Sequence, residues 1–341
     1  MKIAFINIYQ ESVARGAETF VKELAARLSS KHQVEIISDK WAKPQSQVKP
    51  KFFWRFFVDP QSLAILKFTL KNLKKILKEK YDVVIPLNGG WQPALVRFVT
   101  WLYGGKMVIA GQSGIGWDDI NNLWCFPDTF VAISSYAANW ARAMNPVCKV
   151  TYIPNGVDTN KFNPNGDIYK NNLKPPVVLT VAALTKTKRV DLVIRAVAKT
   201  KNLSLLICGR GEEKENLQKL GEKLLKSRFK IIESSFENLP PIYRSANIFS
   251  LVSEPFYAFE IVLLEAMATN LPVVANQDPI RGEIVGQGGV LVDPENSKEY
   301  AKVLEGALKA KWEKLPLTQA KEFDWNIVAQ KYETLFRKLI K

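Results

Sequence analysis

Short apolar runs alternate with amphipathic stretches along the whole chain. In the first half, Phe20, Leu24 and Leu28 recur at the spacing of one helix face and predict a helix over residues 17–29. A second helix is predicted over residues 136–144. The short apolar runs predict buried strands at residues 3–8, 34–38, 83–86, 106–110, 129–133 and 150–153. Strands that alternate with helices are typical of βα units and parallel sheets.

Residues 163–176 interrupt this pattern with four prolines or glycines among polar side chains, which is typical of a linker. A second series of strands, separated by helices, is then predicted at residues 177–181, 203–208, 230–232, 248–251, 272–275 and 290–292. We therefore expect an α/β protein with two doubly wound, Rossmann-like domains, residues 1–165 and 166–324, that face a cleft. Ligands of such sheets bind beyond the carboxyl ends of the strands.

Composition and charge narrow the classes of function. The 341 residues include 48 Lys and Arg against 33 Asp and Glu, a net charge of +15 that favours an anionic partner. The three cysteines show no ligand or disulfide spacing. The single histidine, His32, is expected on the surface between a helix and a strand, which leaves no Ser-His-Asp or Cys-His mechanism. No apolar run suits a signal peptide or a membrane span, so a cytoplasmic location is expected.

Cations and aromatic rings are interleaved between residues 40 and 80, where Lys51-Phe52-Phe53-Trp54-Arg55-Phe56-Phe57 is the densest run. This combination suits an anionic membrane surface, because rings insert at the interface while cations meet the headgroups. A solvated helix over residues 66–77 that packs its apolar stripe on the core is the alternative, and no nucleic-acid-binding module surrounds the segment. The basic residues are Lys40, Lys43, Lys49, Lys51, Arg55, Lys67, Lys71, Lys74, Lys75, Lys78 and Lys80.

An acidic residue in the apolar run of residues 253–276 is the strongest sign of chemistry. Glu265 lies where Ile261, Leu264 and Ala268 would bury the same helix face, and a carboxylate there needs a partner such as a bound polyol. The run resembles the donor-sugar motif of family 4 glycosyltransferases, retaining enzymes of the GT-B fold. That motif reads Glu-Gly/Ala-Phe-Gly, four residues, Glu-Ala-Met-Ala. Glu265-Ala266-Met267-Ala268 matches its second half, whereas Tyr257 replaces the first Glu and Glu260 replaces the second glycine.

Further segments carry the same resemblance over almost the whole chain. Gly16, between the first strand and first helix, resembles the loop that admits the donor diphosphate. Lys188 and Arg189 follow the first strand of the second domain, where the family places cations that neutralise the leaving diphosphate; Ala183 stands at the position of the family's Arg. Gln112 stands where many members carry a His that faces the acceptor. For each short motif, an ordinary turn or a solvated polar loop is the alternative.

The resemblance implies transfer of a hexose from a nucleotide-diphosphate sugar to a saccharide or lipid-linked acceptor, with retention of configuration. Donor-binding residues would be Gly16, Lys188, Arg189 and Glu265, while Gln112, Tyr257 and Glu260 would face the reaction. No cofactor and no metal ion is expected, and no nucleic acid partner. The helix over residues 325–341 would pack back on the first domain. A weakened nucleotide-sugar-binding homologue, with or without membrane docking, and a nucleotide-sugar epimerase remain alternatives, because two motif positions are substituted.

Overall fold

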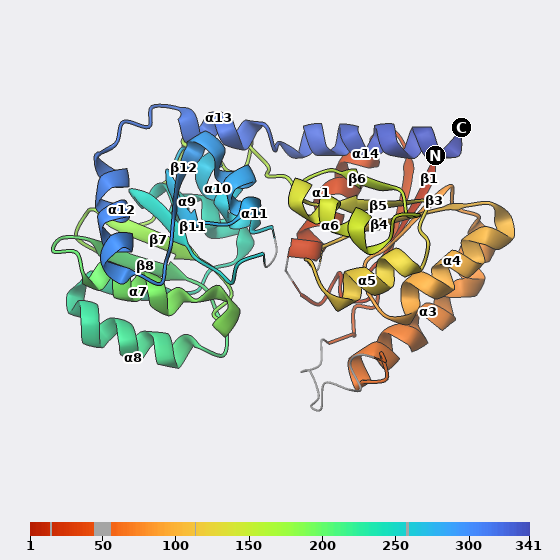
Figure 1. Ribbon diagram of the computed structural model, residues 1–341, viewed down its shortest axis with the longest axis horizontal. Coiled ribbons are helices and arrows are strands. Elements are labelled where there is room, and N and C mark those ends of the chain that lie inside the picture. Colours follow the sequence, from red (N-terminus) through yellow and green to blue (C-terminus); the bar gives the residue numbers. More distant parts are fainter. Residues whose placement is uncertain (14–15, 44–55, 113, 257–258) are drawn as a thin grey trace. The chain divides into compact units, whose positions relative to one another are not determined.

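The protein divides into two compact units, each with its own hydrophobic core. The computed structural model describes residues 1–13, 16–43, 56–112, 114–256 and 259–341. One unit comprises Met1–Asn155 with Trp325–Lys341, and the other comprises Gly156–Asp324 (Figure 1). The second unit thus begins ten residues before the boundary expected at 165/166, because Phe162 packs its ring on Phe236 and Tyr243.

The first unit is built on a parallel sheet of six described strands in the order β2-β1-β3-β4-β5-β6. The strands are β1 (Lys2–Ile6), β2 (Gln33–Ile37), β3 (Val83–Pro86), β4 (Lys106–Ala110), β5 (Thr129–Ala132) and β6 (Val150–Tyr152). The helices are α1 (Gly16–Leu28), α3 (Pro60–Glu79), α4 (Trp91–Tyr103), α5 (Trp117–Trp124), α6 (Ser135–Met144) and α14 (Trp325–Ile340). Strand order reverses between β1 and β3, which marks the ligand-binding edge of such a sheet.

The second unit repeats this plan with the strand order β12-β11-β10-β7-β8-β9. The strands are β7 (Val177–Val181), β8 (Ser204–Cys208), β9 (Phe229–Ile232), β10 (Ile248–Leu251), β11 (Val273–Asn276) and β12 (Gly289–Val292). The α-helices are α7 (Val190–Ala198), α8 (Lys214–Leu225), α9 (Leu239–Arg244), α10 (Ile261–Ala268), α11 (Pro279–Val285), α12 (Ser297–Lys309) and α13 (Leu315–Lys321). Here the order reverses between β7 and β10.

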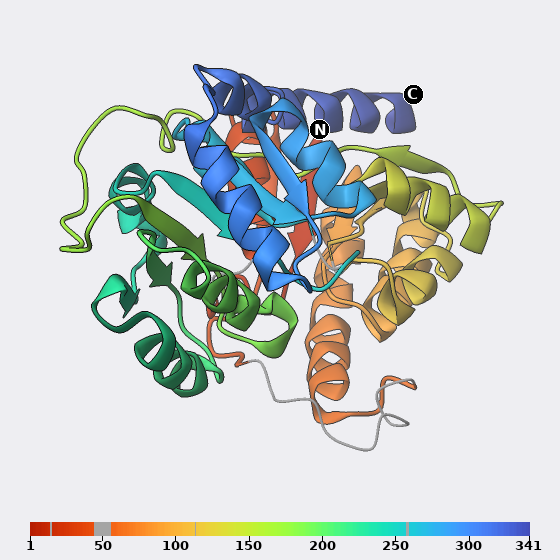
Figure 2. The ribbon, with the colours of Figure 1, turned by 60° about the vertical axis from the view of Figure 1, so that its left-hand side comes forward.

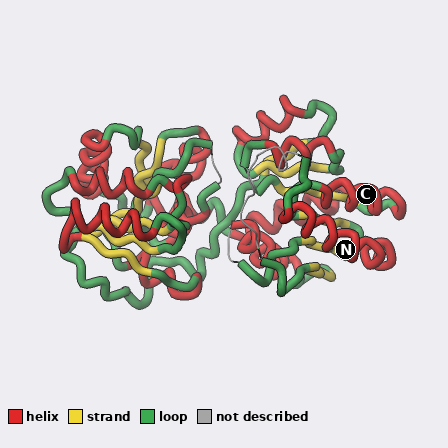
Figure 3. The backbone as a smooth tube through the Cα atoms, turned by 90° about the horizontal axis from the view of Figure 1, so that it is seen from below, coloured by secondary structure: helices red, strands yellow, loops and turns green. Residues whose placement is uncertain are grey.

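Helices cover both faces of each sheet (Figures 2 and 3). Strands buried on both faces read as continuous apolar runs, which is why β7 and β8 are buried at every position. The predicted strands all occur, with ends that differ by at most two residues. The predicted helix over residues 66–77 extends over Pro60–Glu79, since the Asp59 carboxylate accepts hydrogen bonds from the Gln61 and Ser62 amides and begins α3 earlier.

The C-terminal helix α14 belongs to the first unit, where it packs against α1. Its Tyr332 ring lies 5.6 Å from the Phe20 ring, centroid to centroid, and Trp325 and Phe336 are buried in the same cluster. The expectation of a solvated His32 is wrong, because the imidazole is buried with its Nε2 atom 3.2 Å from Glu333 of α14. His32 therefore lies within the packing of the first unit.

In the described part of the chain, no helix combines the length and the apolar character needed to cross a membrane.

Candidate functional site

Two charged side chains meet where the strand order of the second sheet reverses. Lys188 ends the short 3₁₀ helix η1 (Lys186–Lys188) after β7, and Glu260 directly precedes α10 in the segment after β10. The Lys188 Nζ atom donates a hydrogen bond of 2.6 Å to Glu260 Oε1. Both side chains are largely buried, with exposed fractions of 14% and 6%. An ion pair at this sheet position lies where doubly wound folds bind their ligands.

A glycine turn after β8 supports the loop that carries Lys188. The Leu184 amide donates to the Arg210 carbonyl oxygen over 2.9 Å, so the loop after β7 runs beside the turn at residues 208–211. A side chain on Gly209 would overlap the Ala182 carbonyl oxygen, and Gly211 has a φ of +157°. Only glycine allows this close approach without rearrangement, which gives the glycines a structural role behind the site.

Arg281 is a second cation of this cluster and was not among the site residues predicted from the sequence. It lies in α11, is 1% exposed, and its NH2 group donates to the Ser253 hydroxyl over 2.6 Å. The same NH2 group lies 3.5 Å from Glu260 Oε1, and NH1 lies 3.3 Å from Asp278 Oδ2. Loops from β7, β10 and β11 therefore bring two cations and two carboxylates together.

Asp278 is fixed in this cluster by its role as the N-cap of α11. Its Oδ1 atom accepts hydrogen bonds from the Ile280 and Arg281 amides over 2.9 and 3.0 Å. Its Oδ2 atom accepts from Asn276 over 2.5 Å. These bonds satisfy orphan amides of the first helical turn and hold the carboxylate in place.

Glu260 has a left-handed backbone conformation, with φ 59° and ψ 67°. This conformation costs a residue with a side chain about 1–2 kcal/mol relative to its right-handed form, whereas glycine tolerates it. The related sequence motif has glycine here, and the observed backbone gives a physical reason for that preference. Glu260 therefore keeps a side chain at a position that disfavours one.

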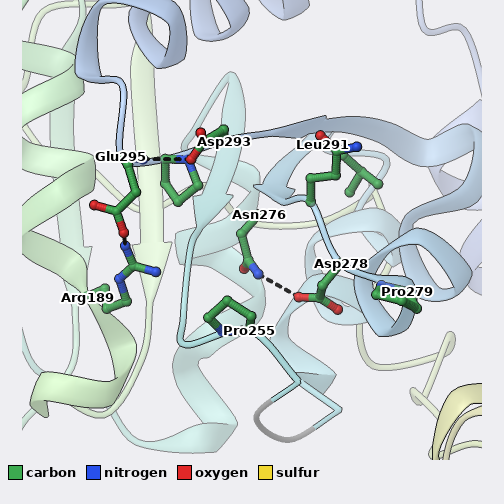
Figure 4. Close-up of a pocket in the computed structure, with 10 residues that line it drawn as sticks. Arg189, Pro255, Asn276, Asp278, Pro279, Leu291, Asp293 and Glu295 are labelled. Carbon is green, nitrogen blue, oxygen red and sulfur yellow. Dashed lines mark hydrogen bonds and ion pairs between the residues drawn. The ribbon is translucent and has the colours of Figure 1, made fainter.

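A cavity of about 680 Å³ lies at the carboxyl ends of β11 and β12 (Figure 4). Arg189 lines one side and forms an ion pair with Glu295, whereas Lys188 pairs with Glu260. The proposed sharing of a diphosphate by Lys188 and Arg189 stays a prediction. The other lining residues are Pro255, Asn276, Gln277, Asp278, Pro279, Leu291, Asp293 and Pro294.

Glu265 lies in α10 with its side chain buried. Its Oε2 atom accepts a hydrogen bond of 2.7 Å from the Tyr243 hydroxyl. Burial raises the pKa of the Glu265 carboxyl group to about 7, against the opposing effects of the Tyr243 hydrogen bond and the Lys161 charge. One carboxylate oxygen of Glu265 therefore already accepts a hydrogen bond within the protein. Binding of ribose hydroxyls by this carboxylate stays a prediction.

The remaining candidates lie in the first unit or outside the described residues. Gly16 is the first residue of α1. Gln112 follows β4, and its side-chain amide donates to Asn155 Oδ1 over 3.1 Å and accepts from Asn155 Nδ2 over 2.9 Å, which engages one of its two N–H groups and its carbonyl oxygen. Tyr257 lies outside the described residues, as do Lys51 and the aromatic rings of residues 52–54.

At the first unit's own reversal point, polar side chains from separate segments meet. Asn88, after β3, donates from Nδ2 to Asn7 Oδ1 over 3.2 Å, and Asn7 Nδ2 lies 3.2 Å from Glu18 Oε1. Glu18 is in the first turn of α1, two residues after Gly16. The loop with Gly16 therefore ends beside a buried polar cluster. Among the described residues, no group of three or more His, Cys, Asp or Glu side chains has the arrangement of a metal site.

Two family models match the chain in succession. Residues 14–161 match the model described as Glycosyltransferase Family 4, and residues 164–322 match the model described as Glycosyl transferases group 1. Among curated relatives, a GDP-mannose-dependent alpha-(1-6)-phosphatidylinositol monomannoside mannosyltransferase of Mycolicibacterium smegmatis is 24% identical over 82% of this chain and 81% of its own length. The O-antigen biosynthesis glycosyltransferase WclY of Escherichia coli is 27% identical over 100% of this chain and 99% of its own length.

Solved structures share the fold over nearly the full chain. Sucrose-phosphate synthase from Thermosynechococcus elongatus superposes with a TM-score of 0.79 at 17% identity, covering 99% of this chain and 98% of that one. HepE from Anabaena, in complex with UDP and glucose, gives a TM-score of 0.75 at 17% identity and covers 99% of this chain and 100% of that one. This likeness confirms the GT-B fold expected from the sequence.

Proposed function

Because the chain belongs to the family 4 glycosyltransferases, we propose that it moves a hexose from a nucleoside diphosphate sugar to a saccharide or lipid-linked acceptor with retention of configuration. The pair of buried cations at the reversal point of the second sheet, Lys188 and Arg281, carries this proposal. The relatives support the substrate classes, since one is named a GDP-mannose-dependent mannosyltransferase and a similar structure was solved with UDP and glucose.

The chemistry of a departing diphosphate requires fixed positive charge. Negative charge grows on the phosphate oxygens as the bond to the sugar breaks, and preorganised cations stabilise it most in a site that excludes water. Lys188 and Arg281 are suited to this role because both are largely buried and held by partners. We propose that these side chains supply the charge without a divalent metal ion. The amino end of α10, which follows Glu260, adds partial positive charge.

A binding and transfer experiment tests this function. The purified protein is assayed by thermal shift with UDP, GDP and their glucose, galactose and mannose derivatives, in buffer with EDTA. We expect one nucleotide series to raise the melting temperature, and the matching donor to lose its hexose to a saccharide or lipid-linked acceptor. Binding without transfer or donor hydrolysis would favour the alternative of a nucleotide-sugar-binding homologue.

We also propose that the first unit meets an anionic membrane surface from the cytoplasmic side. Helices α3 and α4 pack side by side (Figure 1). The exposed apolar side chains of these two helices are here called the α3/α4 face. On α3, Leu63, Leu70 and Leu77 are seven residues apart and so follow one side of the helix. The α4 members of the face are Phe98, Trp101 and Leu102, with Trp101 61% exposed.

The charge of these helices favours a membrane over a protein as the partner of this face. Lys67, Lys71, Lys74, Lys75 and Lys78 of α3 are exposed, whereas α3 has Glu79 as its acidic residue and α4 has none. Exposed rings on α4 and exposed lysines on the neighbouring α3 match the interfacial depth and the anionic headgroups of a bilayer. A lipid-linked acceptor would reach the enzyme at such a surface.

A further inference from the structure

We infer that the Glu260 carboxylate is an internal substitute for the donor diphosphate: it holds the diphosphate-binding cations until the donor arrives and displaces it. This inference rests on the proposed function of the same site. It gives Glu260 a role in donor exchange, in place of direct attack or sugar binding. The carboxylate would withdraw from Lys188 when a diphosphate binds and would return when the nucleoside diphosphate leaves.

The contacts of Glu260 single out its carboxylate as an anion ligand of the site. Its Oε1 atom is shared by Lys188 Nζ at 2.6 Å and Arg281 NH2 at 3.5 Å. The side chain makes no capping hydrogen bond to α10, although it directly precedes that helix. Charged groups with so little exposure are stable only when opposite charges face them. The carboxylate thus occupies the position where a phosphate oxygen would meet both cations.

Of the two carboxylates in the cluster, Glu260 is the one that can leave. Asp278 is fixed by two backbone amides and by the Asn276 amide. Glu260 is held by the two cations, which a diphosphate can satisfy equally well. A phosphate group also offers more acceptor oxygens in a geometry that matches a guanidinium. When a phosphate replaces the Glu260 carboxylate, Lys188 and Arg281 therefore still face a negative charge.

The charges around Lys188 and Arg281 determine whether Glu260 weakens or strengthens donor binding. Glu260 and Asp278 place two carboxylates beside Lys188 and Arg281, so a diphosphate that approaches these cations competes with a carboxylate. A neutral side chain at position 260 would remove one of these two competing negative charges. The wild-type residue therefore weakens donor binding and promotes release of the nucleoside diphosphate.

Calorimetric binding of UDP, GDP and inorganic pyrophosphate tests the inference with two variants. Glu260→Gln removes the charge and keeps the shape, while Glu260→Gly also suits the left-handed backbone. We expect both variants to bind the diphosphate about 10- to 100-fold more tightly than the wild type. This is the change in affinity expected when one competing charge-assisted hydrogen bond is removed. In a Lys188→Ala background the same change should gain much less, since the displaced ion pair is already absent.

The matched control is Glu222→Gln, which removes the same charge from an exposed position near the end of α8. That helix starts after β8 and runs away from the ligand-binding edge, so affinity should stay at the wild-type value. In steady-state transfer, nucleoside diphosphate should inhibit Glu260→Gln at 10- to 100-fold lower concentration than it inhibits the wild type.

The results separate this inference from the proposed function. If the wild type transfers hexose and the folded Glu260 variants bind diphosphate equally or more weakly, Glu260 positions Lys188 and the inference is wrong. If neither the wild type nor the variants bind nucleotides or pyrophosphate, the cluster is no diphosphate site, and both proposals fail. Circular dichroism and melting curves establish that each variant is folded, and Glu260→Gly provides the second test if Glu260→Gln is unstable.

Discussion

Lys188 is the residue whose removal should change donor binding most simply. Its ammonium group is buried beside Glu260, and the proposed diphosphate would take the place of that carboxylate. We expect Lys188→Ala to weaken nucleoside diphosphate binding by roughly 1.5–3 kcal/mol, the range for a hydrogen bond to a charged group. Titration calorimetry measures the loss, and Lys186→Ala, an exposed lysine of the same 3₁₀ helix, is the control. Equal affinities for wild type and Lys188→Ala would remove Lys188 from the site.

Glu265 should make the second unit less stable as the pH rises. Burial raises the pKa of its carboxyl group to about 7 from 4.5, so the folded state holds a proton that the unfolded state has already released. The protonated carboxyl group contributes its full share to the free energy of unfolding below pH 4.5. This contribution, on the order of 3 kcal/mol, is lost as the pH rises to 7. Glu265→Gln should therefore show a smaller fall in melting temperature between pH 5 and 8. The exposed control Glu222→Gln should behave as the wild type does. An equal fall in melting temperature for Glu265→Gln and the wild type would contradict the role of Glu265.

The sequence predicted some residues of this site and could not predict others. Lys188 follows a strand inside a recognisable motif, so its place at the sheet edge could be expected. Nothing in the sequence around Arg281 indicates that its side chain contacts Ser253 and Glu260. Those contacts exist only after the segments following β10 and β11 fold side by side. The left-handed backbone of Glu260 was likewise beyond the sequence, although the glycine of related motifs pointed to an unusual conformation there.

At the scale of elements, the strands and helices with a clear hydrophobic pattern were the ones that the sequence predicted. β3, β4, β7 and β10 have the predicted ends because buried strands of a parallel sheet are continuous apolar runs bounded by polar turns. Helix α4 was not predicted individually. Its sequence, WQPALVRFVTWLY, is rich in apolar residues, and some of them lie on its exposed side as well as on its buried side. The exposed ones form the α4 part of the α3/α4 face.

The α3/α4 face should bind anionic vesicles through both rings and charges. We expect the wild type to co-sediment with vesicles of phosphatidylglycerol and phosphatidylcholine at low salt, since each nearby cation contributes about 1 kcal/mol. Raising the salt should release part of the protein, because exposed charges are screened over ~10 Å at 0.1 M. Replacing Phe98, Trp101 and Leu102 with Ser should abolish the salt-resistant part.

A matched triple variant in the second unit controls for general loss of hydrophobicity. Ile168, Leu224 and Leu315 are also exposed apolar residues, and their replacement with Ser should leave vesicle binding unchanged. If the wild type stays in the supernatant with anionic vesicles at low salt, the face is no membrane contact. If it binds neutral and anionic vesicles equally, the lysines of α3 have no part in docking.

At the scale of the whole molecule, the chain's last helix completes the core of its first unit. Trp325, Val328, Tyr332 and Phe336 of α14 are buried with Phe20 of α1 in one apolar cluster. The first unit therefore cannot bury this surface until the last residues of the chain are present, whereas Gly156–Asp324 contains its own core. Each unit should accordingly have its own local stability, as cooperative subunits of a structure commonly do.

Phe336→Ala tests this dependence. Truncating a fully buried Phe costs roughly 3–5 kcal/mol, and here the cavity would open between α14 and α1. Hydrogen exchange followed by mass spectrometry should show faster exchange in β1, α1 and α14, while peptides from Gly156–Asp324 keep wild-type rates. Leu304→Ala, a buried change in α12 of the second unit, should give the reverse pattern. Equal acceleration in both units for either variant would mean that the molecule opens as one cooperative body, with α14 stabilising the whole protein rather than the first unit.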